Sequence, residues 1–309
     1  MPELLDKRLI FVTGKGGVGK STVAAAIGLA GARAGKRTIV CEVSQQDRVS
    51  RAFKREGVAG EETELAPGLW AISIDPQRAL EEYLRVQVGS KRLFNLLFQN
   101  RFFQYFAAAA PGAKELVTIG KVWELAQLDR PWTSKQTRYD LVVVDAPASG
   151  HGLGILRTPR TFRDIARVGP IRRQADKIDK FIRDPKRTGI VVAALPEEMP
   201  VNETLDFEER LAKEMRLGVD LVVVNALYPE RFTGPEAERL GALDGKLDPS
   251  AHAAVRAALS EHNRARAQRV QLRRLKKQVE NVATLPFLFE PELGIDEFER
   301  LSRSLERRL

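Results

Sequence analysis

The sequence is poor in cysteine and has no long apolar run. Its 309 residues include one cysteine, Cys41, which excludes a disulfide within the chain and a zinc site built from several cysteines of one chain. The most apolar later stretches, Val23 to Ala32 and Phe102 to Ala110, fall well short of the ~20 residues that span a bilayer. The early apolar run, Leu9 to Val12, is far shorter than a signal-peptide core. We therefore expect a cytoplasmic protein without stable membrane insertion.

Charge and apolar content are those of a folded protein with an anionic partner. Apolar residues make up 43% of the chain and charged residues 29%, so a sizeable core can form. The net charge of +9 favours nucleotides, nucleic acid or an acidic lipid surface. One basic run could serve nucleic acid or lipid, but a solvated helix face is the commoner explanation, so we do not expect nucleic acid as a partner. The run consists of Arg264, Arg266, Arg269, Arg273, Arg274, Lys276 and Lys277.

Short β-branched runs recur along the chain between longer segments of helical periodicity. Their continuous apolar character predicts strands buried on both faces, in a mainly parallel sheet flanked by helices, which is an α/β fold. The candidate strands are Leu9–Thr13, Thr38–Val43, Leu69–Asp75, Leu141–Asp145, Gly189–Leu195, Leu221–Asn225 and Val282–Phe287.

We expect one domain over residues 1–309, with two helical insertions. Residues 77–131 are too many for one crossover helix and predict an inserted helical subdomain, to which residues 153–187 add a second segment. Residues 228–250 are rich in glycine and proline, a composition that predicts a flexible loop region.

The strongest motif is a glycine-rich run between the first candidate strand and a predicted helix, Lys20 to Arg33. Its glycines let backbone N–H groups point at phosphate oxygens, and the helix adds the positive end of its dipole. Lys20 would neutralise the β- and γ-phosphates, and the Ser21 hydroxyl would bind Mg²⁺. The sequence therefore predicts a P-loop NTPase sheet that binds ATP or ADP. The run is Gly14, Lys15, Gly16, Gly17, Val18, Gly19, Lys20, Ser21 and Thr22.

Asp145 ends the candidate strand Leu141–Asp145. In a parallel sheet such a carboxylate can hold a magnesium-bound water opposite Ser21. An acidic strand end alone is weak evidence, but here it accompanies the glycine-rich run. We predict Ser21 and Asp145 as the metal-binding residues, and Lys20 and Asp145 as catalytic ones.

Several segments resemble one family of ATPases. Lys15 resembles the signature lysine of the deviant P-loop ATPases, and Ala146 to Gly152 closely resembles the switch II segment of the ArsA type. Further similar segments cover nearly the whole chain: Ala110–Gly112 with Glu115 and Leu116, Pro196–Thr204, Val224–Asn225 and Leu285–Phe287. The resemblance implies a dimer in which Lys15 crosses the interface to the partner's nucleotide, which adds Lys15 to the predicted catalytic residues.

The same resemblance suggests roles for four residues outside the loop. Asn225 would hydrogen-bond adenine, Pro286 and Phe287 would line the base, and Glu203 would lie near the nucleotide or the dimer contact. The alternatives are an asparagine that caps a strand end, a loop proline and a solvated helix glutamate.

The chain also departs from the family pattern. The water-orienting aspartate of switch I aligns with Ser44, and losing such a group commonly costs about 10²–10³ in rate. Glu42 or Asp47 could substitute, although both are displaced from the aligned position. The chain has neither duplicated halves nor a Cys-x-x-Cys pair, so arsenite transport is not expected, and protein contacts and nucleotide must hold any dimer.

The leading hypothesis is an ATP-hydrolysing dimeric switch, either a homodimer or a heterodimer with a related ATPase that supplies the missing residue. An aromatic cluster lies where the resemblance to the tail-anchored-protein targeting branch implies a groove for a membrane-protein or other hydrophobic client, with an ordinary helical core as the alternative. A ParA- or MinD-like positioning ATPase and an ATP-bound scaffold with little turnover remain open. The cluster is Phe94, Leu97, Phe98, Phe102, Phe103, Tyr105 and Phe106.

Overall fold

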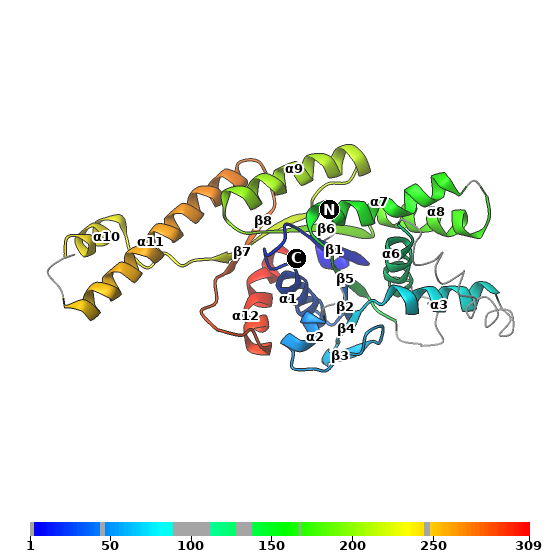
Figure 1. Cartoon of the computed structure of the whole chain (residues 1–309), viewed down its shortest axis with the longest axis horizontal. Helices are drawn as coiled ribbons and strands as arrows, with labels where there is room; N and C mark the ends of the chain where they lie inside the picture. The colour runs from blue at the N-terminus through cyan, green and yellow to red at the C-terminus, as the bar shows by residue number, and fades with distance from the viewer. Residues whose placement is uncertain (1–2, 44–46, 89–111, 128–137, 167, 244–247) are drawn as a thin grey trace.

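The computed structural model describes residues 3–43, 47–88, 112–127, 138–166, 168–243 and 248–309. Its strands are β1 (Leu9–Thr13), β2 (Thr38–Glu42), β3 (Thr63–Ala66), β4 (Leu69–Ser73), β5 (Leu141–Asp145), β6 (Thr188–Ala194), β7 (Leu221–Leu227) and β8 (Val282–Pro286). They form one sheet in the order β3-β4-β2-β5-β1-β6-β7-β8 (Figure 1). Every neighbouring pair is parallel except β3 with β4. The predicted mainly parallel α/β sheet is confirmed.

All the predicted strands are present, and their ends differ by a residue or two. The sequence analysis missed β3, an antiparallel strand at the edge of the sheet. Only Leu65 of this strand is buried, so it lacks the continuous apolar run that marks the other strands. A strand with one buried side chain leaves little periodic signal in the sequence.

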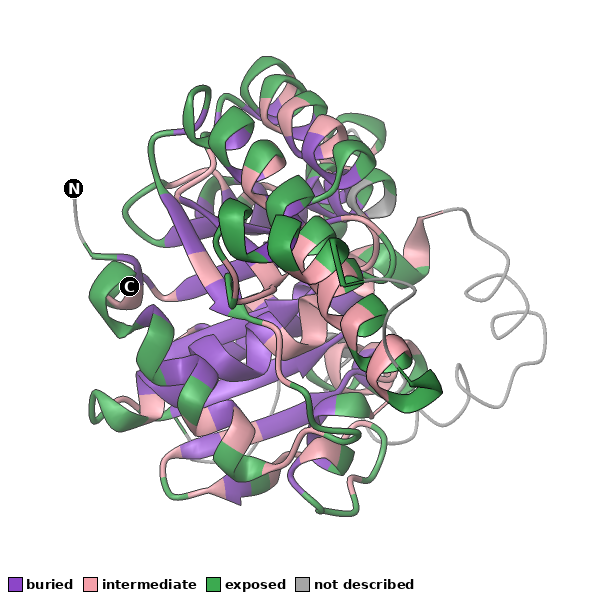
Figure 2. Cartoon of the chain, turned by 90° about the vertical axis from the view of Figure 1, so that its left-hand side faces the viewer, coloured by how far each residue is buried: buried purple, intermediate pink, exposed green. Residues whose placement is uncertain are grey.

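Both faces of the sheet are covered, as continuous apolar strands require. In β1, Leu9 and Phe11 join one hydrophobic cluster, and Ile10 and Val12 join the other. This alternation follows from the two-residue period of a strand. Figure 2 shows the resulting layer of buried strands between more exposed helices.

The helices divide between the two faces (Figure 1). Side chains of α1 (Lys20–Arg33), α2 (Arg48–Ala52) and α12 (Ile295–Leu305) bury against one face. The other face buries side chains of α6 (Ala113–Leu125), α7 (Ser149–Ile165), α8 (Pro170–Ile182), α9 (Glu198–Met215) and α11 (Pro249–Lys276). Helix α3 (Pro76–Val88) packs beside α6, and 3₁₀ turns cover Leu4–Asp6 and Glu306–Arg308.

Helix α1 packs unusually close to the sheet. A Cβ on Gly28 would lie 2.6 Å from Val40 Cγ2, and one on Gly31 would lie 2.8 Å from Thr38 Oγ1. Only glycine permits this approach. Since Lys20 and Ser21 occupy the first turn of α1, the same packing fixes their position relative to the strand ends.

The prediction of a flexible loop over residues 228–250 is wrong for much of that range. Helix α10 (Gly234–Gly241) begins there, with Thr233 and Glu236 in a capping box, and Asp248 caps the start of α11. Pro235 and Pro249 occupy first-turn positions, where proline favours a helix because no N–H partner is needed. Helices α10 and α11 together extend away from the sheet (Figure 1).

The described parts of residues 77–131 and 153–187 are largely helical and comprise α3, α6, α7 and α8. Their grouping into one inserted subdomain stays a prediction. The aromatic cluster at 94–106 and Ser44 lie outside the described residues. Among the helices the model describes, none is long and apolar enough to cross a membrane.

Candidate nucleotide-binding site

The glycine-rich loop lies at the carboxyl end of β1, between β5 and β6. Gly14, Gly17 and Gly19 have positive φ angles of 148°, 85° and 85°, which side chains rarely adopt. A Cβ on Gly14 would lie 2.1 Å from the Ala193 carbonyl oxygen, so this glycine also permits a close approach to β6. Gly16 and Gly17 are exposed. The loop thus has the curled backbone and the accessible face that phosphate binding needs.

Two contacts anchor the loop, one made by the Val18 side chain and one by Asn225. The Val18 side chain is buried in the core, and its carbonyl oxygen accepts a hydrogen bond from Asn225 Nδ2 at 3.0 Å. Asn225 lies in β7, so this bond ties the loop to a strand distant in sequence. The predicted contact of Asn225 with adenine stays a prediction.

Gly19→Ala should destabilise the protein more than Gly17→Ala. Both positions have φ of 85°, but only a Cβ on Gly19 meets another group, Asn225 Nδ2 at 2.2 Å. The φ strain costs about 1–2 kcal/mol at each position, and the overlap should add about 1–3 kcal/mol at Gly19. Chemical denaturation of the two variants measures the difference. Asn225→Ala should remove the added cost, whereas an unchanged difference in that background would refute the assignment to this overlap.

Lys20 is half-buried within the loop. Its Nζ donates a hydrogen bond to the Lys15 carbonyl oxygen at 3.0 Å. Burial lowers the pKa of Lys20, the charge of Asp145 opposes that shift, and the charge of Arg48 adds to it. The ammonium group is therefore held where an incoming anion would favour its charged form.

Ser21 and Asp145, the predicted metal-binding pair, are in direct contact. Ser21 Oγ donates to Asp145 Oδ2 at 2.5 Å, and Asp145 is 3% exposed. Burial raises the pKa of Asp145, while the Ser21 hydrogen bond and the charges of Lys20 and Arg48 oppose the rise. A hydroxyl and a carboxylate at one point fit Mg²⁺, which takes few protein oxygens and keeps its other positions for water and phosphate.

Glu42 ends β2 directly beside Asp145, with which it pairs in the sheet register. It is fully buried, and its Oε1 accepts the backbone N–H groups of Arg48 at 2.7 Å and Val49 at 3.3 Å. Its Oε2 is buried and has no hydrogen-bond partner in the described structure. Burial raises the pKa of Glu42 to about 7, against the effect of the two backbone hydrogen bonds.

Asp47, the other proposed substitute for the switch I aspartate, contacts a different part of the chain. Its carboxylate lies against Gly57, where an added Cβ would come within 2.5 Å of Asp47 Oδ1. Of the two candidates, Glu42 is the one that the sheet places next to Asp145.

Glu42→Gln should stabilise the nucleotide-free protein at pH 8 but not near pH 5. The pKa of Glu42 rises from 4.5 to about 7 on folding, so between these values the folded state binds more protons than the unfolded state. Stability from this group is therefore lost as pH rises through that window, by on the order of 3 kcal/mol. Glutamine has no charge to bury, so its advantage grows between pH 4.5 and about 7 and is complete above that range. Denaturation at both pH values, with the exposed Glu56→Gln as control, measures it, and an equal effect at both would contradict the prediction.

Lys15 and Glu203, predicted separately, form an ion pair. Lys15 Nζ lies 2.9 Å from Glu203 Oε1, with the two side chains 30% and 38% exposed. The glutamate projects from the first half of α9. The pairing brings a second predicted site residue to the loop, although neither role in nucleotide binding is tested by it.

Phe287 belongs to an aromatic group that the sequence analysis missed. Its ring stacks on Tyr228 at 4.3 Å, and Phe289 meets both rings edge-on. The guanidinium of Arg264 lies 5.2 Å from the Tyr228 ring centre and donates to its hydroxyl at 2.9 Å. Arg264 of the basic run therefore contacts Tyr228, the residue that follows the carboxyl end of β7. The exposed Pro286 of β8 pairs with Leu227 at the same end of the sheet. The sequence feature that could have indicated this aromatic group is Tyr228, three residues after Asn225.

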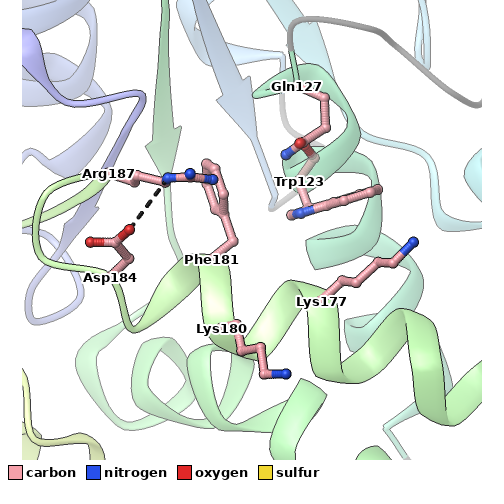
Figure 3. A pocket seen from close by; sticks show the side chains of 7 residues that line it. All are labelled: Trp123, Gln127, Lys177, Lys180, Phe181, Asp184 and Arg187. Carbon is pink, nitrogen blue, oxygen red and sulfur yellow. Dashed lines mark hydrogen bonds and ion pairs between the residues drawn. The ribbon is translucent and has the colours of Figure 1, made fainter.

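A surface pocket of about 580 Å³ lies between α6 and α8, away from the loop. Figure 3 shows Trp123 and Phe181 on its walls, with Lys177, Lys180 and Arg187 around them. Arg187 directly precedes β6, which places this part of the pocket at the amino end of that strand. The nucleotide loop follows the carboxyl end of β1 instead, so the two features are separate.

Comparisons with known proteins agree with the geometry. Residues 7–172 match the family model described as anion-transporting ATPase, ArsA. ATPase BagA of Mycobacterium tuberculosis is 31% identical over 82% of this chain and 73% of its own length. ATPase GET3 of Chaetomium globosum is 24% identical over 99% of this chain and 93% of its own length. A putative arsenical pump-driving ATPase of Halobacterium salinarum is 28% identical over 74% of this chain, but only 36% of its own length.

Proposed function

This chain belongs to the ArsA anion-transporting ATPase family, and from that premise we propose that it hydrolyses Mg·ATP as a dimeric molecular switch. The observation that carries the proposal is the direct contact of Ser21 with Asp145 beside Lys20. A magnesium-binding pair and a phosphate-neutralising cation thus meet at the mouth of one loop. These are the groups that phosphoryl transfer from ATP requires.

In the proposed reaction the loop residues position charge rather than form covalent bonds. Backbone N–H groups of Gly16 to Lys20 would cradle the phosphates, and Lys20 would exchange the Lys15 carbonyl for a phosphate oxygen. Ser21 and Asp145 would hold magnesium, directly or through water. Magnesium supplies neutralisation of the β- and γ-phosphate charge when bound. Asn225, Pro286 and Phe287 would contact the base.

The switch would act through the segment that follows Asp145. Thr13 Oγ1 donates to the Pro147 carbonyl oxygen at 3.4 Å, and an added Cβ on Gly152 would lie 2.5 Å from Thr13 Oγ1. Since α7 begins at Ser149 and packs on α8, a shift at Asp145 has a short route to these helices. Such a rearrangement is the usual output of nucleotide switches.

The dimer would be a homodimer or a heterodimer with a related ATPase. The Lys15–Glu203 pair supports a switchable contact, because both side chains are partly exposed and the bond is worth little in solvent. Lys15 would leave Glu203 for the partner's nucleotide when ATP is bound. Ser44 at the usual aspartate position supports a partner chain that orients water. A hydrophobic or membrane-protein client would respond to the closed dimer.

Steady-state hydrolysis by the purified chain tests the proposal. Turnover should require Mg²⁺, and its rate per chain should rise with protein concentration if a dimer is the active form. Addition of a related ATPase from the same cell should raise it further if the working unit is a heterodimer. Brisk turnover without a partner would reject the heterodimer, and ATP retained through a chase without hydrolysis would favour the scaffold alternative. Absence of any Mg·ATP or Mg·ADP binding to folded protein would overturn the whole proposal.

A further inference from the structure

Arg48 is the first residue of α2, and the sequence analysis gave it no role. Its backbone N–H donates to Glu42 Oε1 at 2.7 Å, and the next N–H, that of Val49, donates to the same oxygen. Glu42 is fully buried at the end of β2. A rigid strand end thus sets the start of α2.

The sheet register connects this anchor to the phosphate site. Glu42 pairs with Asp145, and Asp145 accepts the Ser21 hydroxyl next to Lys20. The positive charge of Arg48 opposes the rise in the pKa of Asp145 and lowers the pKa of Lys20. The Arg48 guanidinium is therefore within electrostatic reach of both residues.

Lys20 and Arg48 repel one another, and the charge of Asp145, which acts on Lys20 and is acted on by Arg48, offsets part of that repulsion. The Arg48 side chain is exposed, and the structure gives its guanidinium no ion pair with any other described residue. Many surface arginines of this chain do have such pairs, including Arg78 with Glu61 and Arg157 with Glu214. A guanidinium that has no ion pair among the described residues and lies within electrostatic reach of a loop lysine fits a polyphosphate, which guanidinium groups bind through paired hydrogen bonds.

We propose that Arg48 contacts the terminal phosphate of bound ATP from within the same chain, and that Glu42 is its positioning residue. The inference rests on the proposed ATP hydrolysis. In that step the oxygen of water bonds to the γ-phosphorus, the bond to the β–γ bridging oxygen breaks with its electron pair left on ADP, and the water proton passes to the released phosphate. Arg48 stabilises the charge on the transferring group, as arginine does in other nucleotide hydrolases.

Glu42 has a role here that is separate from its charge. Glu42→Gln keeps an oxygen that can accept the amides of Arg48 and Val49, whereas Glu42→Ala removes it. Hydrolysis should therefore fall much further in Glu42→Ala than in Glu42→Gln. The loss in Glu42→Ala should not add to the loss in Arg48→Ala, because both act through one guanidinium.

The test compares Arg48→Ala and Arg48→Lys with Arg51→Ala, which removes an exposed arginine from the last turn of the same helix. Arg48→Ala should lower kcat by about 10²-fold or more and keep KM within a few-fold, with Arg48→Lys in between. Its affinity for Mg·ADP should stay near that of wild type, and its affinity for the transition-state analogue Mg·ADP·AlF₄⁻ should fall in parallel with kcat. Arg51→Ala should behave as wild type in each assay.

Two results would overturn the assignment. One is an Arg48→Ala variant that matches Arg51→Ala in kcat and analogue affinity. The other is an equal loss of affinity for ADP and for the analogue, which would mean general attraction rather than contact with the terminal phosphate. If wild type binds nucleotide but does not hydrolyse it, the proposed ATPase function fails separately. In that case the preference for ATP over ADP still tests Arg48, since its removal should reduce that preference by a few-fold and Arg51→Ala should not.

Discussion

Replacing Lys20 with methionine should lower ATP hydrolysis by about 10²–10³-fold and nucleotide affinity by about 10-fold or more. Methionine nearly matches the lysine stem in volume but cannot neutralise phosphate. The fold should tolerate it, because burial already penalises the charged form of Lys20 and its one hydrogen bond is to the Lys15 carbonyl. We therefore expect unfolding free energy close to that of wild type.

Calorimetric titration with Mg·ADP and a phosphate-release assay measure these two effects. Lys180→Met is the matched control, because this lysine on α8 is exposed and its ion pair with Asp176 lies one turn away, far from the loop. It should retain full activity. A Lys20→Met protein that binds and hydrolyses ATP as well as the control would mean that the phosphates occupy another site.

The loop could be predicted because its determinants are local. Glycine at positions 14, 17 and 19, an apolar strand before them and an alanine-rich helix after them all lie within residues 9–33. Each glycine has a backbone reason visible in the structure, such as the positive φ of Gly17 and Gly19. The same applies to Asp145, whose strand is identified by four consecutive apolar residues before it.

The contacts around the loop could not be predicted, because they join residues far apart in the sequence. The Lys15–Glu203 pair and the Asn225–Val18 bond depend on where α9 and β7 come to lie. The stacking of Tyr228 on Phe287 depends on the neighbouring positions of β7 and β8. The sequence analysis named most of these residues from family resemblance, but nothing in local periodicity indicated their partners.

The sequence indicated Glu42 as a carboxylate at a strand end but did not indicate its environment. A glutamate at a strand end is a visible feature, but whether it is solvated or buried depends on α2 covering it. The structure gives it two backbone donors on one oxygen and none on the other. A buried carboxylate oxygen without a hydrogen-bond partner lowers the stability of the fold. Proteins commonly keep such destabilising groups at functional sites.

Asp145→Asn should keep or raise the stability of the fold while it lowers ATP hydrolysis. The carboxylate is almost fully buried, and burial raises its pKa despite the hydrogen bond from Ser21. Asparagine has the same shape and keeps an oxygen to accept that bond, but it carries no charge to desolvate. Since a raised carboxyl pKa destabilises the folded state as pH rises through it, the variant should be as stable as wild type at pH 5 and at least as stable at pH 8.

Activity should fall by about 10²–10³-fold in the same variant, because an amide is a poor ligand for a magnesium-bound water and no longer offsets the metal charge. The Mg²⁺ concentration that gives half-maximal hydrolysis should rise, whereas ADP affinity measured in EDTA should stay within a few-fold of wild type. Asp176→Asn, on the surface of α8, should change neither quantity. If Asp145→Asn lost stability and metal dependence together, Asp145 would be a structural residue of the sheet end, and the case for a magnesium site built on Ser21 and Asp145 would fail.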